Sequence, residues 1–220
     1  MGYFESVVVI YLRELFYPNG FQFPLAVIPQ KIAVVEFWRE AATIIMLLMM
    51  GIIAGKNTAQ RFSFFLLCFG VWDIFYYIFL KLLLHWPASL FTQDILFVIP
   101  VPWVGPVLAP CLVSLTMIVL TLCVVYYHEK DIRVTISNKE WLIFILGAAV
   151  VVLSFTWDYL QYISLNNGSI WTPVSQAALF DEIPHFIPQD FNWWLFSAGE
   201  LFLIAGIFLM VYRHRKLTYN

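Results

Sequence analysis

The sequence predicts an all-α polytopic membrane protein, built as a single domain with a bundle of five transmembrane helices. Three observations lead to this prediction. Of the 220 residues, 62% are hydrophobic and only 12% are charged, whereas a soluble domain is about half apolar and about a quarter charged. Five apolar stretches are long enough to cross a bilayer, and Lys and Arg gather in alternate loops. A folded chain of this length still exposes much of its surface, so this composition requires lipid as the surrounding solvent.

The five spans follow from the length rule. A bilayer core about 30 Å thick requires about 20 apolar residues at a rise of about 1.5 Å each. The stretches that qualify are about 32–55, 62–86, 104–127, 140–164 and 193–212.

The N-terminal segment 1–31 is expected to lie outside the cytoplasm, with an interfacial helix over residues 3–17. This stretch is apolar but carries Glu5, Arg13 and Glu14, and Pro18-Asn19-Gly20 ends it. A helix too short to span that mixes apolar and charged residues is typical of the membrane interface. A sixth, tilted span over the same residues is the alternative.

The distribution of cations predicts the orientation, because cytoplasmic loops are enriched in Lys and Arg. The loops of about 87–103 and 165–192 contain no Lys or Arg, whereas Arg13 and Lys31 of the first segment count weakly against the scheme. We therefore expect a protein of the plasma (bacterial inner) membrane, with its N-terminus outside and a cytoplasmic tail at 213–220. The cations that define the cytoplasmic side are Lys56, Arg61, Lys130, Arg133, Lys139, Arg213, Arg215 and Lys216.

The two outer loops are rich in proline and apolar residues. Residues 99–106 and 183–188 are the clearest examples. Backbone groups at membrane depth need partners or water, so we expect these loops to fold back as a lid over the outer end of the bundle.

Charged side chains within the spans are the strongest functional signal, because each is costly in hydrocarbon. Asp73 lies near mid-membrane and the others lie in the outer half, which predicts an outward-facing polar pocket. The spans carry five carboxylates and two cations, which leaves three excess negative charges if all are ionised. The carboxylates are Glu36, Glu40, Asp73, Asp158 and Glu200, and the cations are Arg39 and Lys81. A low-dielectric site holds such an excess only with protons, a cation or water. With Tyr77, four residues after Asp73, the candidates are Glu36, Arg39, Glu40, Asp73, Tyr77, Lys81, Asp158 and Glu200.

Signals for cofactors are weak. His185, Asp158 and Glu200 are side-chain types that bind iron, manganese or zinc, but no span carries Glu-x-x-His or His-Glu-x-x-His. No cofactor is predicted, although a metal ion or a quinone remains open. The net charge of −2 gives no basic field for nucleic acid.

Three functional hypotheses remain. The preferred one is a subunit of a larger membrane complex, with lipid and other membrane protein subunits as partners, in which the carboxylate cluster handles protons or a cation or stabilises the bundle. The second is a stand-alone transporter or binding protein for a small solute. The third is an intramembrane enzyme that modifies lipid at the outer leaflet, with Asp158, Glu200 and His185 as acid, base or metal ligands. The preferred hypothesis is not enzymatic, and no catalytic residue is assigned.

Overall fold

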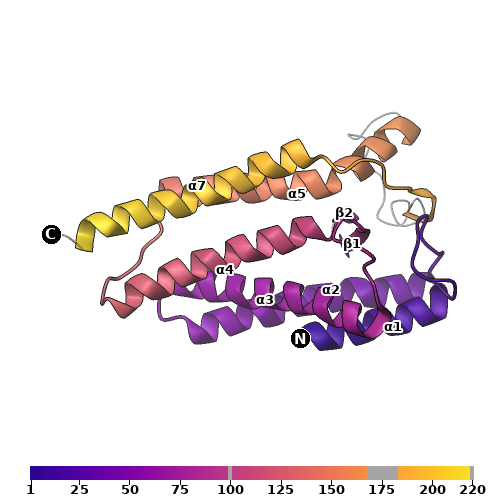
Figure 1. Ribbon diagram of the computed structural model, residues 1–220, viewed down its shortest axis with the longest axis horizontal. Helices are drawn as coiled ribbons and strands as arrows, with labels where there is room; N and C mark the ends of the chain where they lie inside the picture. The colour runs from indigo at the N-terminus through magenta and orange to yellow at the C-terminus, as the bar shows by residue number, and fades with distance from the viewer. Residues whose placement is uncertain (99–100, 168–182, 219–220) are drawn as a thin grey trace.

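Five helices of the computed structural model are long and apolar enough to cross a membrane, which confirms the predicted number of spans among the described residues. The structure describes residues 1–98, 101–167 and 183–218. The spanning helices are α2 (Gln30–Ala54), α3 (Thr58–Leu84), α4 (Leu108–Glu129), α5 (Asn138–Asn167) and α7 (Trp193–Thr218) (Figure 1). A shorter helix, α1 (Gly2–Phe16), precedes them, and a 3-10 turn, η1 (Ile183–His185), precedes α7.

The bundle has two unlike ends. Strands β1 (Gln93–Phe97) and β2 (Trp103–Pro106) form an antiparallel hairpin between α3 and α4, and we call this the hairpin end. The α2–α3 and α4–α5 connections and the C-terminal end of α7 lie at the opposite end, which we call the basic end (Figure 1). Five apolar helices make this a membrane-embedded protein.

The helices form two groups joined by α4. In Figure 1, α5 and α7 form one layer, and α1, α2 and α3 form the other, with α4 between them. Helix α3 packs against α1, α2 and α4, whereas α5 packs against α7 and β2. Helix α4 also touches α7, so it connects the two groups.

Glycines allow α5 and α7 to approach closely. A Cβ atom built on Gly199 would lie 2.8 Å from the backbone nitrogen of Val151, and one built on Gly147 would lie 3.1 Å from the carbonyl oxygen of Gly199. Small residues at such crossings let membrane helices pack backbone against backbone. The α5–α7 pair therefore depends on the absence of side chains at Gly147 and Gly199.

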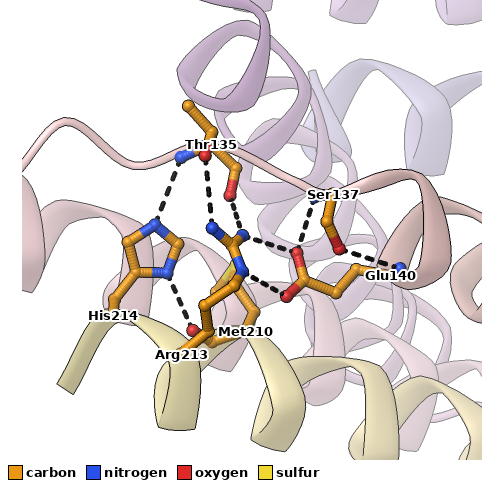
Figure 2. Close-up of polar contacts among 6 residues, drawn as sticks. All are labelled: Thr135, Ser137, Glu140, Met210, Arg213 and His214. Carbon is orange, nitrogen blue, oxygen red and sulfur yellow. Dashed lines mark hydrogen bonds and ion pairs between the residues drawn. The ribbon is translucent and has the colours of Figure 1, made fainter. Parts of the chain in front are cut away.

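An ion pair and its hydrogen bonds, which we call the polar clamp, join α5 and α7 at the basic end (Figure 2). The guanidinium of Arg213 on α7 donates to both carboxylate oxygens of Glu140 on α5, at 2.8 and 2.7 Å. Glu140 also accepts from the backbone N–H of Ser137 at 2.7 Å, and Ser137 Oγ accepts from the N–H of Glu140 at 3.3 Å. This is a capping box, so one glutamate both starts α5 and ties it to α7.

His214 adds a second link beside the clamp (Figure 2). Its Nε2 accepts from the backbone N–H of Thr135 at 3.3 Å, and its Nδ1 lies 2.8 Å from the carbonyl oxygen of Met210. Because a backbone N–H can only donate, Nε2 is unprotonated and Nδ1 carries the proton. The α4–α5 connection is thus held onto α7 by a neutral, fully buried imidazole.

Helix α1 differs from the predicted interfacial helix. It runs alongside α3 in the same direction, with Ser6 Oγ donating to the carbonyl oxygen of Tyr76 at 3.2 Å. Its buried face carries Glu5, Ser6 and Arg13, whereas Phe4 is 75% exposed. The prediction was wrong because it assumed that the charged face meets water, whereas that face meets partners inside the bundle. Fifteen residues span about 22 Å, so α1 is also too short to be the alternative sixth span.

Two approximate span ends near the hairpin differ from the helix ends that the structure shows. The third span was expected from residue 104, but Trp103–Pro106 is a strand, in which Gly105 pairs with Asp94, and α4 begins at Leu108. The second span was expected to reach residue 86, but α3 ends at Leu84 because His85 adopts a left-handed backbone with φ 55°.

Substituting Gly199 with valine should destabilise the bundle. The added atoms have no space against the backbone of Val151, and overpacking of this kind costs about 1–3 kcal/mol. Thermal unfolding of the detergent-solubilised protein measures the effect. Ala205→Val on the exposed side of α7 is the matched control, and equal melting temperatures for the two variants would contradict the proposed close packing.

Candidate functional site

A small polar pocket lies at the hairpin-end half of the bundle, between α1, α2, α3 and β1. Its volume is about 90 Å³. Charged and hydroxyl-bearing side chains line it together with aromatic rings. The lining residues are Glu5, Val9, Arg39, Glu40, Thr43, Trp72, Asp73, Tyr76, Tyr77, Ile95, Leu96 and Phe97. We call this the carboxylate pocket.

Arg39 organises one wall of the carboxylate pocket. Its Nε donates to Glu36 one turn earlier on α2, at 2.7 Å, and its Nη1 forms an ion pair with Glu5 of α1. Thr43 Oγ1 donates to the other oxygen of Glu5 at 2.8 Å. Glu5 thus has two partners on α2, which explains why α1 docks inside the bundle.

Glu40 connects α2 to the hairpin. One of its carboxylate oxygens accepts from the backbone N–H of Val98, just after β1, at 3.1 Å. The side chain is buried. A backbone donor at membrane depth needs an acceptor, and Glu40 supplies it where β1 ends.

Asp73 lies near the middle of α3, between two cavities. Its Oδ2 accepts from Ser114 Oγ of α4 at 2.8 Å. The same residue lines both the carboxylate pocket and a larger apolar cavity. Gly70, one turn earlier, brings α3 close to the carbonyl oxygen of Ser114, since a Cβ atom there would lie 2.8 Å from it. That close approach places Ser114 within reach of Asp73.

Asp94 on β1 brings a further carboxylate to the site. Tyr77 donates to its Oδ2 at 3.2 Å, and Arg13 of α1 lies 3.9 Å from its Oδ1. Burial raises the pKa of Asp94 to about 6, although Arg13, the backbone N–H of Ile95 and the Tyr77 hydroxyl all act to lower it. The pKa of the Asp94 carboxyl therefore lies well above its usual range.

Aromatic rings fix Arg13 in this position. Its guanidinium lies 3.8 Å from the ring centre of Trp86 and 4.5 Å from that of Phe21. Cation–π contacts of this kind hold a desolvated guanidinium without neutralising it. Arg13 is thus held in the last turn of α1, with its positive charge close to Asp94.

The apolar cavity lies between α3 and α4 on one side and α5 and α7 on the other. Its volume is about 280 Å³. Among the described residues, Asp73 is the only ionisable side chain in its lining, and Trp103 Nε1 has no hydrogen-bond partner there. The lining residues are Phe62, Leu66, Phe69, Asp73, Leu96, Phe97, Trp103, Pro110, Val113, Ser114, Thr116, Met117, Leu120, Phe144, Ala148, Val151, Val152, Phe155, Leu203 and Ile207.

The charges of the site do not balance. Two guanidiniums, Arg13 and Arg39, face five carboxylates, so three negative charges remain if every group is ionised. The five are Glu5, Glu36, Glu40, Asp73 and Asp94. An uncompensated charge in a low-dielectric interior is strongly destabilising. Protons or a cation are needed to offset this excess.

The structure brings together five of the eight predicted site residues. Arg39, Glu40, Asp73 and Tyr77 line the carboxylate pocket, and Glu36 joins them through Arg39. These residues come from α2 and α3, which pack against each other.

The other three predicted residues have partners elsewhere, so the structure does not gather all eight candidates in one polar pocket. Lys81 donates to the carbonyl oxygen of Pro87 at 2.8 Å, beyond the end of α3. Asp158 accepts from the backbone N–H of Gln189 at 2.7 Å. Glu200 accepts from Thr116 Oγ1 at 2.7 Å. The sequence prediction used only the depth of each residue along its helix. Residues at the same depth can lie on helix faces that point in different directions.

The weak metal candidates are likewise separate. Asp158 and Glu200 bind Gln189 and Thr116, respectively. Among the residues that the structure describes, no three His, Cys, Asp or Glu side chains form a group that could hold a metal ion.

Three important site residues escaped the sequence prediction. Glu5 and Arg13 lie in a segment too short to span, and Asp94 lies in a connection that was expected to be a loop. One signal was present: Glu5, Val9 and Arg13 are spaced four residues apart and therefore share one helix face. All three positions face the bundle.

Comparison of the chain with protein-family models, with curated proteins and with solved structures finds no match. The fold and the site therefore define the class on their own. This is a polytopic α-helical membrane protein with carboxylates buried between its helices.

Asp94 should make stability depend on pH. Its pKa is higher in the folded protein than in the unfolded chain, so its stabilising contribution is complete below about pH 4 and is lost as the pH rises through about 6. Asp94→Asn should flatten this part of the profile, measured as the melting temperature in detergent from acid to neutral pH. The matched control is Glu14→Gln on the exposed face of α1. Parallel profiles for wild type and Asp94→Asn would contradict the assignment.

Proposed function

We propose that this protein is an integral subunit of a larger membrane complex and that its carboxylate pocket handles protons. The observation that carries the proposal is the charge imbalance of the site, in which five carboxylates face two arginines inside an apolar bundle. Buried intramembrane carboxylates are costly to keep and serve as proton relays in many membrane proteins. Bound protons remove the excess charge without any additional ligand.

Protons suit this pocket better than a metal ion. Hard cations are held by six or more oxygens that converge on one point. Here Arg39 contacts two of the carboxylates directly, and its positive charge repels a cation. The remaining acids accept from Val98, Ser114 and Tyr77, each at a different place around the pocket.

The proposed orientation places the hairpin end outside the cytoplasm. Lys56, Arg61 and Arg133 are at the basic end, and the loops of the hairpin end lack Lys and Arg between 87 and 107. Under the positive-inside rule, the carboxylate pocket then lies in the outer half of the plasma membrane, and α7 ends in the cytoplasm.

Helix α2 supports the assignment as a subunit. Its buried residues form one narrow stripe of Glu40, Thr43, Leu47 and Gly51. The opposite side exposes large side chains in a continuous row, including Trp38, Ile45, Met49 and Ile53. Methionine and aromatic residues adapt well to a packed partner, so this face suits the helix of another subunit.

Infrared spectroscopy tests whether the pocket holds protons. Wild-type protein in nanodiscs at neutral pH should show the carbonyl band of a protonated carboxylic acid, with the small shift in heavy water that identifies it. The double variant Glu40→Gln/Asp73→Asn should lose most of this band, because these amides keep the shape of the acids but bind no exchangeable acid proton.

Asp158→Asn is the matched control for this experiment. It removes one carboxylate from the same half of the bundle without touching the carboxylate pocket. The band should persist in this variant. A wild-type spectrum without a protonated carboxyl, or a band that survives in the double variant, would overturn the proton assignment.

The apolar cavity supports a second candidate function. A cavity of about 280 Å³ is close to the lower end of small-molecule sites. Its wall is apolar except for Asp73, the hydroxyls of Ser114 and Thr116, and the unpartnered Nε1 of Trp103. This arrangement suits a lipid-soluble molecule with one polar group, such as a quinone ring, held by a stand-alone binding protein.

Purification in a mild detergent distinguishes the two functions. A complex subunit should bring other membrane proteins in fixed ratio, and Trp38→Ala on α2 should weaken their recovery. Trp194→Ala on α7, where the ring is 89% exposed, is the matched control and should have no effect. A monomer that carries a lipid-soluble molecule, which Ala148→Phe then displaces from the cavity, would instead support the second function.

A further inference from the structure

A second pocket lies at the basic end, independent of the carboxylate pocket. The α2–α3 turn, the α4–α5 connection and the start of α5 enclose about 500 Å³. Lys56, Arg61 and Arg133 line it, and no aspartate or glutamate does. We call it the basic pocket.

Within the part of the chain that the structure describes, two of the three cations of the basic pocket make no contact that holds the fold, and the third makes one hydrogen bond to the backbone. All three side chains are exposed. Arg61 donates from Nε to the carbonyl oxygen of Gly55 at 3.1 Å, which orients the guanidinium. Among the described residues, Lys56 Nζ and the Arg133 guanidinium make no hydrogen bond or ion pair. By contrast, the nearby Arg213 is fully engaged with Glu140.

The local backbone strengthens the positive field. Helix α3 begins at this pocket, and its 27 residues direct the positive end of the helix dipole into it. Asn57 caps the helix by accepting from the backbone N–H of Gln60 at 3.0 Å. Three cations without a carboxylate partner and a helix N-terminus around one cavity favour a polyoxygen anion, above all a phosphate group.

We propose that the basic pocket binds the phosphate group of an anionic phospholipid. The pocket lies where α3 and α5 begin, which is the depth of lipid headgroups for helices that span a bilayer. Trp141 forms part of its wall and packs against Phe62 at 4.7 Å between ring centres, and tryptophan is enriched at membrane interfaces. Basic pockets between transmembrane helices on the cytoplasmic side bind such headgroups. This inference does not depend on the proton-handling proposal.

Native mass spectrometry of the full-length protein with added lipid tests the proposal. Wild type should retain phosphatidylglycerol or cardiolipin and release phosphatidylcholine. The triple variant Lys56→Gln/Arg61→Gln/Arg133→Gln should bind the anionic lipids on the order of 100-fold more weakly, because each cation near a lipid phosphate contributes roughly fivefold in affinity.

The matched control is Lys130→Gln/Lys139→Gln/Arg215→Gln. It removes the same charge from the same end of the molecule, outside the basic pocket. It should bind anionic lipid as wild type does. Equal losses in the two triple variants, or no loss in either, would overturn the proposal, because binding would then follow net charge alone or other residues.

Inorganic phosphate distinguishes a lipid from a soluble source. At millimolar concentration it should neither bind the lipid-free protein nor displace phosphatidylglycerol. Saturable binding of phosphate alone that the pocket variant abolishes would assign the same phosphate site to a soluble ligand and overturn the lipid assignment. Melting temperatures of the lipid-free variants should lie close to that of wild type, because all six substituted side chains are exposed and each triple variant loses one weak contact, that of Arg61 with Gly55 or that of Lys130 with the Tyr126 ring.

Discussion

The structure depends on one constraint: a charge placed between apolar helices must find a partner within the protein. Glu5 illustrates the consequence. Its ion pair with Arg39 and its hydrogen bond from Thr43 draw α1 into the bundle, although the exposed Phe4 and Leu15 would otherwise suit the membrane interface. The acids therefore determine the path of the chain at the hairpin end, and any functional role is added to that structural one.

Glycine contacts and the apolar cavity have a common origin. Gly147 and Gly199 let α5 and α7 close on each other, and Gly70 does the same for α3 and α4. Each pair is tight within itself, so the space left over lies between the pairs. Large rings close it toward the hairpin end, where Trp103 stacks on Phe155 at 6.5 Å. A cavity at this position follows from strong pairwise packing and needs no flexible segment.

The spans were predictable from the sequence because length and hydropathy decide them locally. Asp73 could be proposed as a site residue because depth along a helix can be counted, and Tyr77 because it lies four residues after Asp73. The direction in which a helix face points could not be predicted, since it depends on neighbours distant in sequence. For this reason Asp158 and Glu200 were grouped with acids that they do not approach, and Asp94 was missed because its strand forms only when β2 pairs with it.

The position of the carboxylate pocket limits how protons could leave it. Toward the basic end lies a largely apolar cluster that includes Leu120, Val124, Phe144 and Met210, and the Tyr127 hydroxyl within it already donates to the carbonyl oxygen of Val211. Proton exchange is therefore expected either at the hairpin end or through Asp73 into the apolar cavity, since Asp73 lines both the carboxylate pocket and the apolar cavity. Among the residues that the structure describes, no carboxylate belongs to this cluster, so a path across the whole membrane would require a further group. A helix from a partner subunit or a lipid-soluble molecule in the cavity would supply it, which is why both proposed functions involve a second component.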